Sequence, residues 1–189
     1  QVPELSLPAV ADEVIRGLKQ GVDCIVTNFA NGDVIGHTNN SEAKIACAKA
    51  VDEHLARVLQ VAKSEGYVTL ITADHGNLEV LLTAEGKPHV AHTSNLVPFI
   101  VIDPQAIEDI QLSDGSLQDI TPTILDIMGV EKHPSMTGTP LVFPRDWGTA
   151  RKVLLIILDG WGEGSQDENN PIFVATTPTW DALCRDFPL

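Results

Sequence analysis

Cysteine and basic residues are scarce in this sequence of 189 residues. Its 3 cysteines, Cys24, Cys47 and Cys184, form no C-x-x-C pair, which argues against a disulfide framework and a thiolate zinc site, so we expect a cytoplasmic location. Lysine and arginine number 12 against 26 acidic residues, for a formal charge of −14. Because nucleic acid and anionic lipid bind to clustered basic side chains, we expect neither partner. The acidic excess suits a protein that gathers divalent cations, or merely a soluble acidic surface.

Long apolar runs and nucleotide-binding loops are also missing from the sequence. No run approaches the roughly 18 apolar residues that a membrane helix needs, so we expect no membrane span. The run Val153–Leu158 is too short, and too far from the first residue, for a signal peptide. Neither G-x-G-x-x-G nor a Walker loop follows any apolar run, which argues against nucleotide-dependent redox chemistry.

Short runs rich in β-branched residues predict strands that are buried on both faces. These runs are Cys24–Thr27, Tyr67–Thr72, Val97–Asp103 and Val153–Leu158. Apolar residues recur every three or four positions in Ser41–Glu65, which predicts an amphipathic helix capped by Asn40 or Ser41. Three further helices are predicted at Ala11–Gln20, at Asp119–Met128 before Gly129, and from Thr177 as N-cap with Pro178 as first helical residue.

Strands that alternate with helices favour parallel pairing through crossover connections. We therefore expect an α/β fold, doubly wound, with a mostly parallel sheet sandwiched by helices. The chain is short for two domains, so residues 1–189 are interpreted as one domain. Pro and Gly interrupt Phe143–Thr149, FPRDWGT, where a linker over 144–150 is expected to join residues 1–143 to residues 151–189.

Polar clusters occur where the predicted strands end. Asp33 and His37 follow the first strand, Asp74 and His75 come directly after the second, and Asp159 closes the last. Ligands of an open parallel sheet gather beyond the carboxyl ends of its strands, so these side chains are expected to converge. A carboxylate at a strand end can instead cap the next helix, but the convergence of all three favours a binding site.

A further cluster, H-V-A-H-T, contains His89 and His92 and precedes its strand, so only a loop that folds back over the sheet would add it to the site. Imidazole nitrogen and carboxylate oxygen are ligands of borderline divalent metals such as zinc, and manganese favours more oxygen. Three aspartates and three histidines could serve two ions. Two neighbouring ions suit phosphoryl transfer, because they bind both the nucleophile and the transferring group.

Several stretches of this sequence resemble one known family. In order and spacing, the C-terminal part of the cofactor-independent phosphoglycerate mutases, of the alkaline phosphatase superfamily, is similar to D-V-I-G-H-T, T-A-D-H-G-N, A-H-T-S-N-L-V-P-F-I, D-I-T-P-T-I-L-D-I-M-G and M-T-G-T-P-L. The family's N-terminus is similar to V-L-L-I-I-L-D-G-W-G and the following A-T-T-P-T-W-D-A-L. Together these stretches cover nearly the whole chain.

The resemblance implies an alkaline phosphatase-like fold with two divalent ions, usually Mn²⁺, with Zn²⁺, Co²⁺ and Mg²⁺ as alternatives. One ion would be held by Asp33, His37 and His92, and the other by Asp74, His75 and Asp159. The family interconverts 3-phosphoglycerate and 2-phosphoglycerate through a phosphoserine, in glycolysis and gluconeogenesis. The resemblance therefore implies a phosphoglycerate substrate, and we expect a monomer.

The sequence departs from the family in two respects. The stretch that resembles the family's beginning comes after the stretch that resembles its end, which is a permuted order. The family's G-N-S-E-V-G-H motif, its arginine-bearing transferase domain and its substrate-contacting lysine do not occur in these residues. We therefore expect the isolated chain to bind metal without mutase turnover.

Alternatives remain open at two residues and for the function. Ser41, in N-N-S-E, superficially echoes the missing motif but is interpreted as a helix cap. His89 is a weaker candidate ligand than His92. The alternative functions are a related metal-dependent phosphatase or phosphopentomutase, and a catalytically silent metal-binding module.

Overall fold

The computed structural model describes residues 2–106, 110–148 and 151–187. Its sheet has four strands in the order β1-β4-β2-β3. They are β1 (Cys24–Phe29), β2 (Val68–Thr72), β3 (Phe99–Ile102) and β4 (Val153–Leu158). The central strand β4 pairs in parallel with both β1 and β2, so three strands point their carboxyl ends toward one edge. The α/β fold with a mostly parallel sheet is confirmed.

Strand β3 departs from the expected parallel pairing. It runs antiparallel to β2, with Thr72 opposite Phe99. The physical reason lies in the connection: residues 73–98 contain no helix that crosses the sheet, so the chain re-enters at the end where it left. The sheet is therefore mixed.

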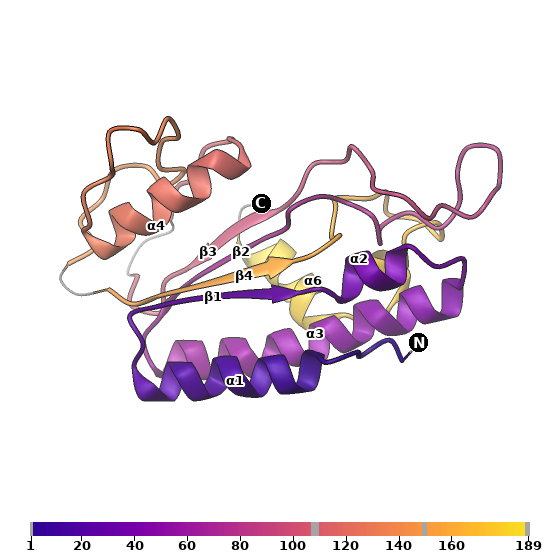
Figure 1. Ribbon diagram of the computed structural model, residues 1–189, viewed down its shortest axis with the longest axis horizontal. Coiled ribbons are helices and arrows are strands. Elements are labelled where there is room, and N and C mark those ends of the chain that lie inside the picture. The colour runs from indigo at the N-terminus through magenta and orange to yellow at the C-terminus, as the bar shows by residue number, and fades with distance from the viewer. Residues whose placement is uncertain (1, 107–109, 149–150, 188–189) are drawn as a thin grey trace.

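Helices cover the two faces of the sheet separately (Figure 1). On one side lie α1 (Leu7–Gln20) and α3 (Ser41–Ser64), which contact each other, and α6 (Pro178–Asp186) packs against α3. On the other side lies α4 (Ile120–Met128), preceded by a 3₁₀ turn, Leu117–Asp119. Two short helices, α2 (Asn31–Gly36) and α5 (Pro171–Val174), were not predicted from the sequence.

The predicted helix ends are largely confirmed. Asn40 caps α3, because its side chain accepts a hydrogen bond from the backbone N–H of Ala43 (3.0 Å), and Ser41 is the first helical residue. Gly129 ends α4 in the left-handed conformation, at φ 67°. Helix α1 begins at Leu7, earlier than predicted, with a proline in its first turn.

The start of α6 is where the sequence predicted it, but its capping partner is different. Thr177 and Pro178 occupy the N-cap and the first helical position, yet the Thr177 side chain caps no backbone N–H. Asp52, buried on α3, accepts hydrogen bonds from the backbone N–H groups of Thr179 (3.2 Å) and Trp180 (2.7 Å) instead. A carboxylate from another helix therefore fixes α6 against α3.

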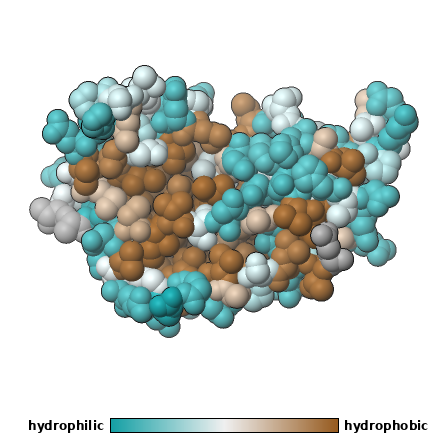
Figure 2. Space-filling model, in the orientation of Figure 1, coloured by the Kyte–Doolittle hydropathy of each residue, from teal (hydrophilic) through white to brown (hydrophobic). Residues whose placement is uncertain are grey.

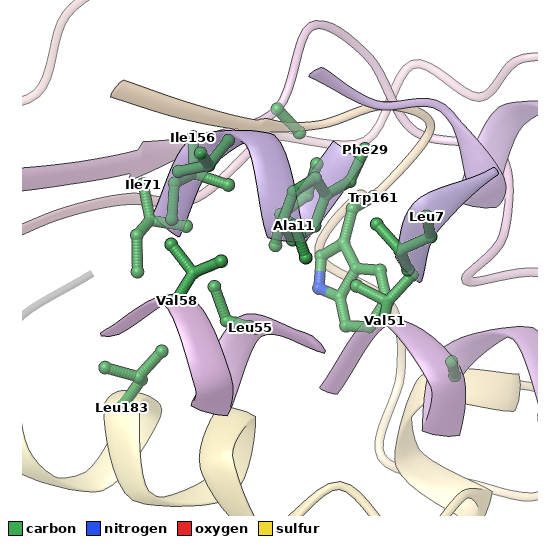
Figure 3. Close-up of a cluster of buried hydrophobic side chains, with 14 of the residues drawn as sticks. Leu7, Ala11, Phe29, Val51, Leu55, Val58, Ile71, Ile156, Trp161 and Leu183 are labelled. Atoms are coloured by element: carbon green, nitrogen blue, oxygen red, sulfur yellow. The ribbon is translucent and has the colours of Figure 1, made fainter. Parts of the chain in front are cut away.

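Side chains of β4 point alternately to the two faces of the sheet and pack into two apolar clusters. Leu154, Ile156 and Leu158 belong to the larger cluster with α1 and α3, part of which Figure 3 shows, while Val153 and Leu155 belong to the cluster with α4. The expectation that every strand is buried on both faces is wrong for β1. Its burial alternates along the strand, because α4 packs farther across the sheet.

Apolar residues reach the surface over the middle of the face shown in Figure 2. Val26 of β1 is among the exposed apolar residues of the chain, at 59% exposure. Within the described ranges, no helix combines the length and the apolarity needed to cross a membrane.

The segment interpreted as a linker packs against the domain in its described part. The Trp147 side chain is buried, and its indole N–H donates to Asp126 Oδ2 (3.0 Å). Arg151 then pairs with Asp103, just beyond β3, and both side chains are nearly inaccessible, at 8% and 2% exposure. Residues 149–150 lie outside the described residues.

The Asp103–Arg151 pair predicts an acid-sensitive contribution to stability. Burial alone would raise the pKa of Asp103, but hydrogen bonds from Arg151 and the backbone N–H of Gln105 outweigh it and lower that pKa. At neutral pH, Asp103→Asn is expected to reduce the free energy of unfolding by about 1.5–3 kcal/mol, the range for hydrogen bonds to charged groups.

The sign of the pH dependence follows from the lowered pKa. A carboxylate whose pKa is lower in the folded state stabilises above its unfolded value, about 3.9, and loses this contribution as pH falls through the folded value. The difference between wild type and Asp103→Asn should therefore shrink below about pH 4. Urea titrations at several pH values measure it, and a difference that stays constant on acidification would contradict the role of Asp103.

Candidate metal centre

The carboxyl ends of three parallel strands bring polar side chains to one edge of the sheet. Asp159 directly follows β4, Asp74 and His75 follow β2, and Asp33 lies on α2, which begins shortly after β1. The backbone N–H of Asp159 donates to the Phe29 carbonyl (3.2 Å), which extends the pairing of β4 with β1 to the site itself.

Two glycines allow the segments after β1 and β4 to touch. A Cβ atom at Gly160, where φ is 72°, would lie 2.5 Å from the backbone nitrogen of Asp33. A Cβ atom at Gly32 would overlap the carbonyl oxygen of Asp159. The close approach of the two backbones, which only glycine permits here, places Asp33 and Asp159 side by side.

Asp33 is the centre of the first half of the site. Its Oδ1 lies 3.0 Å from His92 Nε2, 3.1 Å from His37 Nε2 and 3.9 Å from His75 Nε2. The same oxygen accepts a hydrogen bond from Asn77 Nδ2 (3.0 Å). Three imidazoles therefore face one carboxylate.

His75 connects this half to the second. Its Nε2 lies 3.5 Å from Asp74 Oδ2 and 3.6 Å from Asp159 Oδ1. The His75 ring also stacks on the ring of His92, with centroids 3.7 Å apart. Asp74 Oδ1 accepts a hydrogen bond from the backbone N–H of Gly160 (3.2 Å), which ties the segment after β2 to the segment after β4.

The loop that carries His92 folds back over the sheet edge, as the sequence required for this histidine to join the site. The backbone N–H of Thr93 donates to the Gly76 carbonyl (2.9 Å). His37 Nδ1 lies 2.8 Å from the carbonyl oxygen of Val90, in the same loop. The backbone carbonyl of His89 faces away, toward Lys44 Nζ (2.6 Å).

The six predicted ligands thus lie together, and two compact groups form among them. Ligand atoms lie within 4.8 Å of one another in Asp33, His75 and His92, and likewise in Asp74, His75 and Asp159. The second group coincides with one implied by the family resemblance. In the first, His75 stands where His37 was expected; His37 pairs with Asp33, and its ring centroid lies 5.2 Å from that of His92. His89 belongs to neither group.

The electrostatics of the cluster favour a bound cation. Burial would raise the pKa of Asp33, but the hydrogen bond from Asn77 and the three nearby histidines lower it overall. The pKa of Asp159 is raised, first by burial and then by the charges of Asp74 and Asp33, against a hydrogen bond from Asn28. Among the described residues, the only basic side chains that pair with these three aspartates within 4.0 Å are histidines.

The donor set fits divalent metal. Carboxylate oxygen and imidazole nitrogen are the usual ligands of Zn²⁺ and of related first-row ions. The charge of Asp74 raises the pKa of Asp159, and a bound cation would relieve this repulsion between the two carboxylates. The residues present therefore suit a metal centre in both chemistry and position.

Supporting side chains were missed by reasoning from the sequence. Asn28 Nδ2 donates to Asp159 Oδ2 (3.0 Å), and Asn77 holds Asp33 in the same way. Glu79, fully buried, accepts hydrogen bonds from segments on both sides of the site. Asn77 lies within the quoted T-A-D-H-G-N motif, but the partner of a side-chain amide cannot be read from a sequence.

Comparison with known proteins agrees with this geometry. A family model described as the Metalloenzyme superfamily matches residues 2–132 and 151–186. The chain belongs to the Metalloenzyme superfamily. Membership in this Metalloenzyme superfamily implies a divalent metal, and the cluster of aspartates and histidines supplies its candidate ligands.

Curated relatives carry a more specific name, 2,3-bisphosphoglycerate-independent phosphoglycerate mutase. The protein of Syntrophotalea carbinolica is 46% identical over 143 residues, covering 75% of this chain and 28% of that protein. That of Ruegeria pomeroyi is 43% identical over 141 residues, covering 74% and 28%. Methanosarcina barkeri has a protein with the same name and the suffix 2, 45% identical over 142 residues, covering 74% and 27%. This Metalloenzyme superfamily chain thus spans about a quarter of the length of these relatives.

Proposed function

We propose that this chain forms the metal-binding, phosphatase-type part of a cofactor-independent phosphoglycerate mutase. The convergence of three carboxylates and three imidazoles at one sheet edge carries the proposal. The name that these relatives share supports the mutase assignment. The substrate pair would be 3-phosphoglycerate and 2-phosphoglycerate, exchanged through a phosphoserine.

Six side chains would hold two ions, for which we propose Mn²⁺. They are Asp33, His37 and His92 for one ion, and Asp74, His75 and Asp159 for the other. When bound, such ions act as Lewis acids toward a phosphoryl group and lower the pKa of a hydroxyl nucleophile. His75 is the one residue that belongs to both compact groups of candidate ligands among the described residues.

Hydrogen bonds around the cluster orient the candidate ligands for metal binding. His37 Nδ1 donates to the Val90 carbonyl (2.8 Å), and His75 Nδ1 lies 3.3 Å from the Gly76 carbonyl. A histidine that donates through Nδ1 presents an unprotonated Nε2 to a metal. Asn77 and Asn28 orient Asp33 and Asp159 by donating to their carboxylates.

The chain's part in the reaction is limited by the residues it contains. The motif that carries the family's serine is not among these 189 residues, and Ser41 is the first residue of α3. We propose that residues 1–143 and 151–189 build one metalloenzyme domain joined at 144–150. The isolated chain should then bind metal and a phosphate group without interconverting phosphoglycerates.

A titration of the metal-free chain with MnCl₂ tests the proposal. We expect about two ions per chain, as two neighbouring ions are needed to clamp a phosphoryl group. Inorganic phosphate should bind only to the Mn²⁺-loaded chain, which calorimetry measures directly. A chain that binds no Mn²⁺ would refute the proposed function.

The same samples separate the alternatives. Hydrolysis of p-nitrophenyl phosphate by the loaded chain would indicate a phosphatase that contains its own nucleophile. Binding of Mn²⁺ without any binding of phosphate would indicate a silent metal-binding module. Measurable interconversion of phosphoglycerates by the 189-residue chain would show that the expected lack of a nucleophile is wrong.

A further inference from the structure

We infer that Glu79 is a positioning residue of the metal centre, one that ties together the loops carrying the ligands. Its side chain is buried, at 1% exposure, and it belongs to no ligand group of the described residues. Its carboxylate nevertheless joins the three loops on which Asp74 with His75, His92 and Asp159 are placed. The expected effect of Glu79 on metal affinity rests on the proposed function, whereas its hydrogen bonds to the loops do not.

Both carboxylate oxygens of Glu79 are saturated by donors from these loops. Oε2 accepts from the backbone N–H of Asn77 (2.8 Å), two residues after His75, and from that of Gly162 (3.1 Å), three residues after Asp159. Oε1 accepts from Asn95 Nδ2 (2.9 Å) and from the hydroxyl of Thr93, next to His92. Every loop that carries a ligand from β2, from β4 or from the returning segment therefore donates to this one carboxylate.

The loops also leave room for the carboxylate at glycine positions. A Cβ atom at Gly162 would lie 2.5 Å from Glu79 Oε1, and one at Gly76 would overlap both Glu79 and the Thr93 hydroxyl. A Cβ atom at Gly164 would lie 2.9 Å from the Cβ of Glu79. The backbone is thus packed directly onto the Glu79 side chain on two sides.

An ionised carboxylate is the side chain that this position requires. It offers acceptors only, whereas glutamine would turn an NH₂ group, a donor, toward two of the four donors. Lys44 is buried as well, at 1% exposure: burial lowers its pKa overall, and the nearby charge of Glu79 opposes that shift only in part. Lys44 Nζ also holds the carbonyl of His89 (2.6 Å), in the loop that leads to His92.

Glu79→Gln tests the inference with two readouts. The affinity for Mn²⁺ should fall by about tenfold, the lower end of the cost of losing a direct partner of a ligand, because Glu79 acts on the ligands through the loops that carry them. In the metal-free chain, amide hydrogen exchange at Asn77 and Gly162 should accelerate by about tenfold or more, the factor that a lost hydrogen bond to a charged group gives.

Asp52→Asn is the matched control, since Asp52 is also a buried carboxylate that accepts backbone N–H groups, at the start of α6. It should lower the melting temperature and accelerate exchange at Thr179 and Trp180, and leave the Mn²⁺ affinity unchanged. Should Glu79→Gln fail to fold, Thr93→Val removes a single donor and should give a smaller loss of affinity in the same direction.

The outcomes distinguish the inference from the function on which it rests. A wild-type chain that binds no Mn²⁺ refutes the metal function, and the exchange rates still decide whether Glu79 holds the loops. Unchanged Mn²⁺ affinity in Glu79→Gln, or in Thr93→Val where the first variant does not fold, overturns the inference. An equal loss of Mn²⁺ affinity in Asp52→Asn also overturns the inference. It would show that removing any buried carboxylate lowers the affinity by destabilising the fold.

Discussion

Asp33→Asn is expected to weaken Mn²⁺ binding by more than about 100-fold, because loss of an outer-shell partner alone costs about 10- to 100-fold. Asp33 is the carboxylate toward which three imidazoles point, at 3.0, 3.1 and 3.9 Å. Asparagine keeps the shape of the side chain but removes its negative charge. The imidazoles would then bind the cation without the carboxylate charge that attracts it. Calorimetric titration of the metal-free variant with MnCl₂ measures the loss.

A surface aspartate provides the control for Asp33→Asn. Asp12, with a side chain 65% exposed, pairs with Arg57 outside the site (2.6 Å). Exposed pairs of this kind contribute about 0–1 kcal/mol, so Asp12→Asn should change neither stability nor Mn²⁺ affinity appreciably. Equal Mn²⁺ affinities in Asp33→Asn and Asp12→Asn would contradict the assignment of Asp33 as a ligand.

The stoichiometry in Asp33→Asn adds a second test. Asp74, His75 and Asp159 form a group of their own, in which Asp33 takes no part. The variant should therefore still bind one Mn²⁺ ion per chain, with lower affinity than the wild type, and should not lose both ions. Loss of both ions together would indicate that the two halves of the site fold or bind as one unit, through His75.

The position of the candidate site could be predicted from the sequence because it depends on topology. Asp74 and Asp159 directly follow runs of β-branched residues, and the carboxyl ends of parallel strands meet at one edge. Periodicity predicted α3 almost to the residue, since an amphipathic helix of 24 residues repeats its apolar face many times. For His92 the prediction was conditional: the residue would join the site only if its loop folded back over the sheet, as it does.

The features that escaped prediction depend on contacts between distant segments. The direction of β3 is set by how residues 73–98 return, and nothing local in those residues encodes it. Asp52 caps α6 across 127 positions of sequence, and Gly162 donates to Glu79 across 83. The short α2 has only 6 residues, too few to show a helical period.

Leu55→Ala is expected to give the largest loss of stability that we predict, about 2–5 kcal/mol, through lost transfer energy and the cavity left behind. Leu55 is 1% exposed and lies on the inner side of α3, where Figure 3 shows it among Val58, Ile71 and Leu183. In a chain of this size each kcal/mol lowers the melting temperature by about 2–4 °C. Thermal unfolding should therefore occur roughly 4–20 °C lower than in the wild type.

Leu96→Ala provides a control with the same chemical change at a different burial. Leu96 is 76% exposed, so its side chain gains little from folding, and the substitution should stay within about 0.5 kcal/mol of the wild type. The contrast between the two leucines isolates burial between α3 and the sheet as the source of stability. Similar melting temperatures for Leu55→Ala and Leu96→Ala would mean that α3 does not pack on the sheet in solution, and the scaffold under the metal centre would need another explanation.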